Sequence, residues 1–186
     1  MANRIANLVV LVEDQEQQNL IRRYLERSGH NVRRSRFVPL PSEATGGSGE
    51  QYVRERYPEE VSENRQRVGR GASALLVVMI DADKEETKDR SAQLANALRR
   101  AGVPKRGRTE LIVVLIPRRH VETWIRALLG DAVDERIDYK NPKPTSREIG
   151  AAAETLYAWT RPNADPRLNF PPSLISARPE WRKIPS

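Results

Sequence analysis

The chain has 186 residues, of which 31% are charged and 38% hydrophobic, and a formal net charge of +7. It has no cysteine and two histidines, which excludes disulfides and thiolate metal sites and argues against a multi-histidine zinc centre. No apolar run approaches the roughly eighteen residues that span a bilayer, so we expect a cytoplasmic protein without a membrane partner. The excess of Lys and Arg favours a polyanionic partner such as nucleic acid.

The first predicted element is a buried strand, because "IANLVVLV" at residues 5–12 is a continuous apolar run rich in β-branched residues. Asp14 then suits the N-cap of a helix over about 15–28. The weak alternation of "NVRRSRFVPL" at residues 31–40 predicts an edge strand. The Pro, Gly and Ser content of residues 40–50 predicts a poorly ordered loop.

The central part of the chain begins with a polar, helix-favouring stretch at residues 50–69, with a break expected near Pro58. We expect this stretch to decorate the core rather than to build it. Strands and helices then alternate: strands at 74–80 and 111–116, and helices over about 85–100, 119–129 and 145–160. Thr145 and Glu148 have the spacing of a capping box at the start of the last helix.

This order of elements predicts an α/β fold with a Rossmann-like parallel sheet of about four strands flanked by helices. We expect one domain over residues 1–163, with an insert at about 40–72. Residues 164–186 are rich in proline and predict an extended C-terminal tail packed on the domain.

Acidic residues follow two of the predicted strands. Glu13 comes directly after the first strand and Asp81 directly after "ALLVVMI", while Asp83 and Glu85 lie just beyond. Ligands of such sheets bind outside the carboxyl ends of the strands. Clustered carboxylates repel one another unless a cation compensates, and oxygen ligands suit Mg²⁺ or Mn²⁺. The alternative for Glu85 and Glu86 is helix capping alone.

Three segments carry a resemblance to a known family. "LVVLVED" ends a strand with a glutamate, "MIDADKE" has D-x-D-x-E spacing, and "LIVVLIPRRHVETWI" joins a strand to a helix with a further glutamate. Over roughly residues 5–130 the chain thus resembles the Toprim (topoisomerase–primase) fold family. The resemblance is to small stand-alone Toprim proteins related to the overcoming-lysogenization-defect nucleases.

The resemblance implies a metal-dependent nucleic-acid phosphodiesterase that uses Mg²⁺ or Mn²⁺, with DNA favoured over RNA as substrate. It also implies a bacterial anti-phage defence pair with an ATPase protein as partner. Glu13, Asp81 and Asp83 would be the catalytic residues and metal ligands, with Glu13 as ligand or general base. Glu85 and Glu122 would be further metal ligands.

Several residues near these motifs have two interpretations. The resemblance makes Arg118 and Arg119 contacts to the nucleic-acid backbone, with a basic turn as the alternative. His120 would position water, although the sequence favours a solvent-facing histidine at a helix start, and Trp124 fits the buried stripe of the helix. The family usually has glycine where this chain has Asp14. Either Asp14 forms the turn as a helix cap or the site is altered.

Two other functions remain open. Residues 8–32 resemble the opening of a response-regulator receiver domain, a Mg²⁺-binding phosphoacceptor. A receiver needs its aspartate after the next core strand and a lysine after a fifth strand, whereas residues 33–73 intervene here and no clear fifth strand is predicted. The other alternative is an inactive Toprim-like scaffold that binds an ATPase partner.

Overall fold

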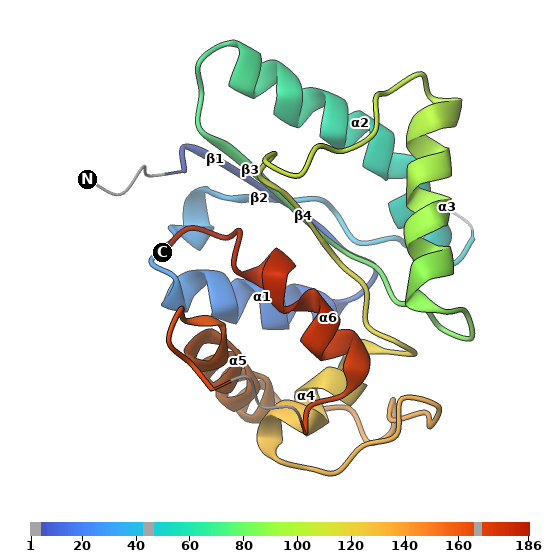
Figure 1. Ribbon diagram of the computed structural model, residues 1–186, viewed down its shortest axis with the longest axis vertical. Coiled ribbons are helices and arrows are strands. Elements are labelled where there is room, and N and C mark those ends of the chain that lie inside the picture. Colours follow the sequence, from blue (N-terminus) through green and yellow to red (C-terminus); the bar gives the residue numbers. More distant parts are fainter. Residues whose placement is uncertain (1–4, 43–46, 166–168) are drawn as a thin grey trace.

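The computed structural model describes residues 5–42, 47–165 and 169–186. It confirms the predicted α/β architecture: a Rossmann-like sheet of four parallel strands lies between two layers of helices (Figure 1). The strand order is β2-β1-β3-β4. The strands are β1 (Asn7–Leu11), β2 (Arg36–Phe37), β3 (Ala74–Met79) and β4 (Ile112–Leu115).

The helices divide between the two faces of the sheet. They are α1 (Gln15–Arg27), α2 (Gly49–Gly69), α3 (Thr87–Arg100), α4 (Val121–Leu129), α5 (Ser146–Thr160) and α6 (Pro172–Trp181), with a 3₁₀ turn, η1, at Val32–Arg34. In Figure 1, α2 and α3 cover one face, and α1, α4, α5 and α6 cover the other. Two apolar cores follow from this division, one on each face.

The central strand β3 is buried along its whole length, as expected of a parallel strand covered on both faces. Leu75, Val77 and Met79 belong to the core shared with α1, α4, α5 and α6. Leu76 and Val78 belong to the core shared with α2 and α3. Because alternate residues point to opposite faces, one apolar run supplies both cores.

The polar stretch after β2 is one continuous helix, α2, and the predicted break at Pro58 is wrong. Val53, Tyr57 and Val61 recur every four residues and pack in the same core as β3, so α2 builds the core rather than decorating it. This packing outweighs the cost of about 3 kcal/mol that a proline imposes on a helix interior. Of the loop expected at 40–50, residues 43–46 lie outside the described residues, and α2 already begins at Gly49.

The C-terminal segment contains a helix, α6, where an extended tail was predicted. Pro171 is its N-cap and Pro172 its first residue, a position where the missing N–H and fixed φ of proline are favourable. Leu174 and Trp181 are buried in the core. The Glu180 carboxylate accepts a 2.9 Å hydrogen bond from the backbone N–H of Val114 on the edge strand β4. The segment is thus helical because its apolar residues share one buried face.

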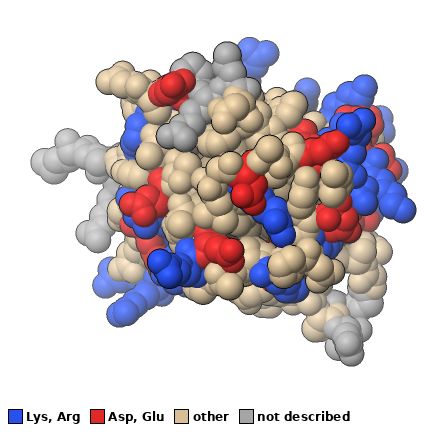
Figure 2. Space-filling view, turned by 90° about the horizontal axis from the view of Figure 1, so that it is seen from below, with Lys and Arg blue, Asp and Glu red and all other residues tan. Residues whose placement is uncertain are grey.

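The surface charge is mixed rather than gathered in one field on the face shown in Figure 2. Lys and Arg lie mainly around the margins of that face, interspersed with Asp and Glu. None of the described helices is both long and apolar enough to cross a membrane.

Candidate functional site

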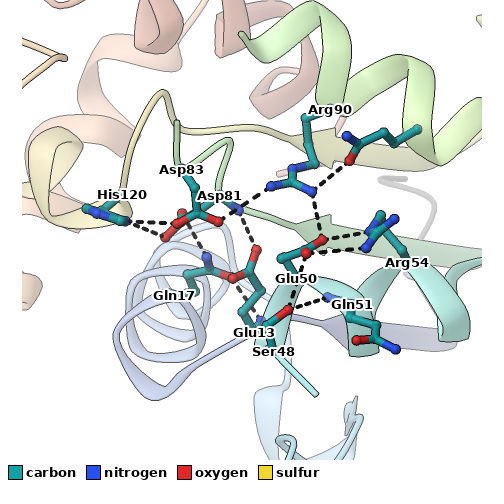
Figure 3. Close-up of polar contacts among 11 residues, drawn as sticks. Glu13, Gln17, Ser48, Glu50, Gln51, Arg54, Asp81, Asp83, Arg90 and His120 are labelled. Carbon is teal, nitrogen blue, oxygen red and sulfur yellow. Dashed lines mark hydrogen bonds and ion pairs between the residues drawn. The ribbon is translucent and has the colours of Figure 1, made fainter. Parts of the chain in front are cut away.

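The carboxyl ends of β1 and β3 bring Glu13 and Asp81 into contact. The two strands are neighbours, with Leu11 paired to Val78, so the chain leaves both strands at the same edge of the sheet. The backbone N–H of Asp81 donates a 2.5 Å hydrogen bond to Glu13 Oε1 (Figure 3). The structure therefore joins the two acids that the sequence places after different strands.

Asp81 is almost completely buried, with 1% of its surface exposed. Its Oδ1 atom accepts a 2.9 Å hydrogen bond from Nε2 of Gln17, and its Oδ2 atom lies 3.5 Å from Nδ1 of His120. Burial raises the pKa of Asp81 well above its usual value, and the nearby carboxylates of Asp14 and Glu122 raise it further. Ionised Asp81 is therefore costly unless a positive charge compensates it.

The carboxyl of Glu13 is also costly to ionise. Burial, and then repulsion from Asp81, raises the pKa of Glu13 to about 9, although its hydrogen bond from the Asp81 N–H acts in the opposite direction. Two carboxyl groups this close titrate as a pair, because ionising one disfavours ionising the other. At neutral pH and without a cation, the pair retains at least one proton.

Gln17 joins the two acids and was not singled out from the sequence. This side chain is fully buried on α1; its Nε2 donates to Asp81 and its Oε1 accepts a 3.1 Å hydrogen bond from the N–H of Glu13. The available signal is the spacing of Asp14 and Gln17, an N-cap acid followed three residues later by Gln, which is the pattern of a capping box. That pattern predicts a helix start but not a bridge between acids.

Asp14, which stands where the Toprim motif usually has glycine, is not strained. It is the N-cap of α1 with an extended backbone, φ −146° and ψ 179°, and its Oδ1 accepts a 2.9 Å hydrogen bond from the N–H of Gln17. A residue of any type adopts this conformation, so the turn does not require glycine. Burial raises the pKa of Asp14 as well.

Asp83 lies nearer the surface than Asp81. Its Oδ1 atom is 3.6 Å from Nδ1 of His120, and its Oδ2 atom is 3.4 Å from Nη2 of Arg90 (Figure 3). Its side chain is 39% exposed. Asp83 therefore forms the boundary between the buried acids and the solvent-filled part of the site.

Glu122 joins the buried acids from the first turn of α4. It is 3% exposed, and its Oε2 atom is buried without a hydrogen-bond partner among the described residues. Burial is the main cause of its raised pKa, and the charge of Asp14 adds to it. Glu85 lies apart from these acids, because its side chain is exposed on the rim of the neighbouring cavity.

His120 is buried, contrary to the expectation of a solvent-facing histidine. It is 6% exposed at the N-cap of α4, with Nδ1 turned toward Asp81 and Asp83. Burial lowers the pKa of His120, and the charge of Lys140 lowers it further, so the ring is neutral near pH 7. Trp124, one turn further along α4, is fully buried in the core as predicted.

The two arginines before His120 differ in their surroundings. Arg118 is held by a 2.6 Å ion pair with Glu86, and its backbone N–H donates to Oγ of Ser173. Arg119 lines the cavity, and its Nε atom is buried without a partner in the part of the chain that is described. Of the pair, Arg119 is thus better placed to meet a ligand.

A cavity of about 460 Å³ opens beside the buried acids. The residues that line it are all ionisable: Glu50, Asp83, Lys84, Glu85, Arg90, Arg119, His120, Asp138 and Lys140. Lys140 also acts on the buried acids, since its charge lowers the pKa of Asp81 against the other influences. The sequence did not single out Arg90 or Lys140, because a lone basic residue in a polar stretch has no distinguishing pattern.

The acids do not form a closed metal cage. Within residues 5–42, 47–165 and 169–186, no group of three or more His, Asp or Glu side chains is arranged to hold a metal ion. What the sheet edge provides is two neighbouring acids, Glu13 and Asp81, joined through the backbone N–H of Asp81, with Asp83 and Glu122 beside them.

The comparisons with known proteins add no family to this description. No protein-family model matches the chain, and neither a curated protein nor a solved structure matches it significantly.

Proposed function

We propose that the chain is a cytoplasmic, Mg²⁺- or Mn²⁺-dependent phosphodiesterase of the Toprim type that cleaves nucleic acid, DNA in preference to RNA. The observation that carries the proposal is the contact between Glu13 and Asp81 at the ends of β1 and β3. In a sheet of order β2-β1-β3-β4, the boundary between these two strands is where ligands bind. A cation would relieve the repulsion that raises both pKa values.

The chemistry of the donor atoms, carboxylate oxygens, is what a hard divalent cation prefers. Asp81 Oδ2 and Asp83 Oδ1 lie 3.5 and 3.6 Å from the same atom, His120 Nδ1, so they converge on one region. Glu122 adds an unpartnered buried oxygen. Mg²⁺ is usually bound through one or two carboxylates, together with water and substrate phosphates. Asp81 and Asp83 would hold the ion, with Glu122 as a further oxygen donor.

The chain's own groups have defined tasks in this proposal. When bound, the ion would stabilise the negative charge that develops on the phosphate. Glu13 would accept the proton of the attacking water, and a bound cation would favour the ionised form of Glu13 that this task requires. Lys84, Arg119 and Lys140 line the cavity and would neutralise the phosphates on either side of the cleaved bond.

One observation favours a receiver-like phosphoacceptor as the second candidate. Residues 33–73, which argued against a receiver in the sequence, contain β2 and α2, so β3 and Asp81 follow in the order that such a domain requires. Two features favour the phosphodiesterase instead. Asp81 is 1% exposed and accepts a hydrogen bond from Gln17, which hinders attack on a phosphoryl donor, and the described sheet ends at β4.

Cleavage of DNA by the purified chain tests the proposal. We expect nicking of supercoiled plasmid with Mn²⁺ or Mg²⁺, its loss in EDTA, and a loss of at least about 100-fold in Asp81→Asn. Asp89→Asn is the matched control, since Asp89 is an exposed acid in the first turn of α3. RNA of the same sequence is run in parallel, and preferential cleavage of the RNA would contradict the choice of DNA.

The alternatives give different results in the same preparation. Stoichiometric labelling of Asp81 by a small phosphoryl donor, without cleavage, would support the receiver. Absence of both activities, together with a stable complex with an ATPase, would support the scaffold. Either outcome would overturn the phosphodiesterase.

A further inference from the structure

Arg90 is a deeply buried arginine for which the proposed reaction gives no task. It is 4% exposed in the first turn of α3. Its Nη1 donates hydrogen bonds of 2.7 Å to Glu50 Oε2 and 2.7 Å to Gln93 Oε1, and its Nη2 lies 3.4 Å from Asp83 Oδ2 (Figure 3). A buried guanidinium is costly unless its donors are used, so these contacts define its position closely.

Arg90 contacts only one of the two carboxylate oxygens of Asp83. It contacts Oδ2, while Oδ1 faces His120 and the side of Asp81. Asp83 follows β3 in a left-handed conformation, φ 53°, so no regular backbone structure fixes its side chain. The orientation of its carboxylate therefore depends on the groups that bond to it, and Arg90 provides the charged donor.

The start of α2 holds Arg90 in place. Glu50, its carboxylate partner, also pairs with Arg54 at 2.6 Å and accepts a 3.2 Å hydrogen bond from Oγ of Ser48. The neighbouring Gly49 packs so closely on Glu13 that an added Cβ would lie 3.0 Å from the Glu13 Cβ. The same segment thus touches Glu13 directly and reaches Asp83 through Arg90.

We propose that Arg90 is a positioning residue, which occupies Asp83 Oδ2 and thereby directs Oδ1 toward the cation that Asp81 and Asp83 would share. The inference rests on the proposed function for the cation, but the orientation of Asp83 can be observed without it. A simple charge effect has the opposite sign, because a nearby guanidinium repels a cation. Removing Arg90 therefore separates the two effects. Cation binding becomes tighter if Arg90 acts only through its charge, and weaker if Arg90 positions Asp83.

Titration calorimetry of Mn²⁺ into the full-length protein tests the inference. We expect Arg90→Gln to weaken Mn²⁺ binding about tenfold or more, the usual effect of removing a group that orients a metal ligand. Arg90→Lys, which retains the charge, should recover part of the affinity. Unchanged or tighter Mn²⁺ binding in Arg90→Gln would overturn the positioning role.

Arg65→Gln is the matched control. Arg65 also joins two segments through an ion pair, 2.7 Å to Glu110, but lies about 24 Å along α2 from Gly49, at 1.5 Å per residue. Its loss should lower the melting temperature without changing Mn²⁺ affinity. If both variants lower the melting temperature and neither changes Mn²⁺ affinity, Arg90 has only a structural role.

Crystal structures of the metal-free wild type and Arg90→Gln complete the test. We expect the Asp83 carboxylate to rotate away from His120 in the variant, and an unmoved carboxylate would contradict the inference. If the wild type binds no Mn²⁺ at all, the proposed function fails, whereas the orientation of Asp83 still shows whether Arg90 determines it.

Discussion

Asp83 and Arg119 face each other across the sheet edge with left-handed backbones. The N–H of Asp83 donates a 3.1 Å hydrogen bond to the carbonyl oxygen of Arg119, and the φ angles are 53° and 70°. Within the described residues they are the two non-glycine positions with positive φ. Two further hydrogen bonds precede this pair: the N–H of Ile80 donates to Leu115 at the end of β4, and the N–H of Ala82 donates to Pro117 just beyond it. Strain of this kind persists where the surrounding structure determines it, often at functional sites.

The strained backbone at Arg119 predicts that substitutions there change the free energy of unfolding more than the same substitutions at Arg118. Arg119→Val should destabilise the fold by about 1–3 kcal/mol, because a β-branched side chain is poorly accommodated at positive φ. Arg119→Gly should retain most of the stability, since glycine adopts this conformation freely. Urea unfolding measures both. Arg118→Val serves as the control, and an equal or larger loss there would contradict the backbone explanation.

The raised pKa of Glu13 predicts that the stability of the metal-free protein depends on pH. Its pKa is about 9 in the fold and roughly 4.3 in an unfolded chain, so between these values the folded state binds more protons. The free energy of unfolding therefore falls as pH rises from about 4 to 9. Glu13→Gln has no carboxyl at this position to ionise, so its stability does not fall in this way. We expect the variant to be more stable than the wild type at pH 8 by roughly 1–3 kcal/mol.

Urea unfolding in EDTA at pH 5 and pH 8 measures this difference. The gain should shrink toward pH 5, where Glu13 is protonated in the folded wild type. Glu85→Gln is the control, because Glu85 is an exposed acid on the cavity rim. Equal pH dependence of the wild type and Glu13→Gln would show that the Glu13 carboxyl is ionised at neutral pH.

The sequence was sufficient to predict the elements whose signals are local. β1 and β3 are long apolar runs, α1 has Asp14 as its N-cap, and the capping box of Thr145 and Glu148 forms as expected at the start of α5. The meeting of Glu13 and Asp81 also followed from the sequence, because parallel strands end at a common edge.

The remaining features depend on packing that no local pattern encodes. Pro58 suggested a break in α2, but the apolar face that includes Tyr57 packs on the sheet and keeps the helix continuous. Proline content suggested an extended tail. The segment is instead a helix, which buries Trp181 in the core and accepts a hydrogen bond from the edge strand β4. Arg90 contacts Glu50 on α2 and Asp83 after β3, and the sequence around Arg90 gives no sign that these two segments meet there.

Gln17 offers a test of the hydrogen bonds that hold the two acids together. Gln17→Ala leaves the N–H of Glu13 and Oδ1 of Asp81 without partners, and each buried unsatisfied group costs about 1–3 kcal/mol. We expect a destabilisation of roughly 2–6 kcal/mol by chemical unfolding. Gln18→Ala, one residue along α1 and partly exposed, should cost less than about 1 kcal/mol. Similar losses at both positions would show that the bridge contributes little.

The raised pKa values predict that cation binding depends on pH. Glu13 and Asp81 share protons in the metal-free protein, and these protons must leave before a cation is held. Mn²⁺ affinity should therefore rise with pH between about 6 and 8, by up to about tenfold per pH unit for each proton released. Calorimetry in buffers of different ionisation enthalpy counts the protons. Affinity that does not change with pH would show that the site is already ionised.

A Mn²⁺-soaked crystal of the full-length protein tests the central claim most directly. We predict an anomalous peak at the edge between β1 and β3, with oxygens of Asp81 and Asp83 about 2.1–2.2 Å from it, near the distances expected for a small divalent cation. Asp81→Asn crystals soaked in the same way should lack the peak. A wild-type map without a peak at this edge, with the Glu13 carboxyl still bonded to the backbone N–H of Asp81 as in the metal-free protein, would contradict the proposed function.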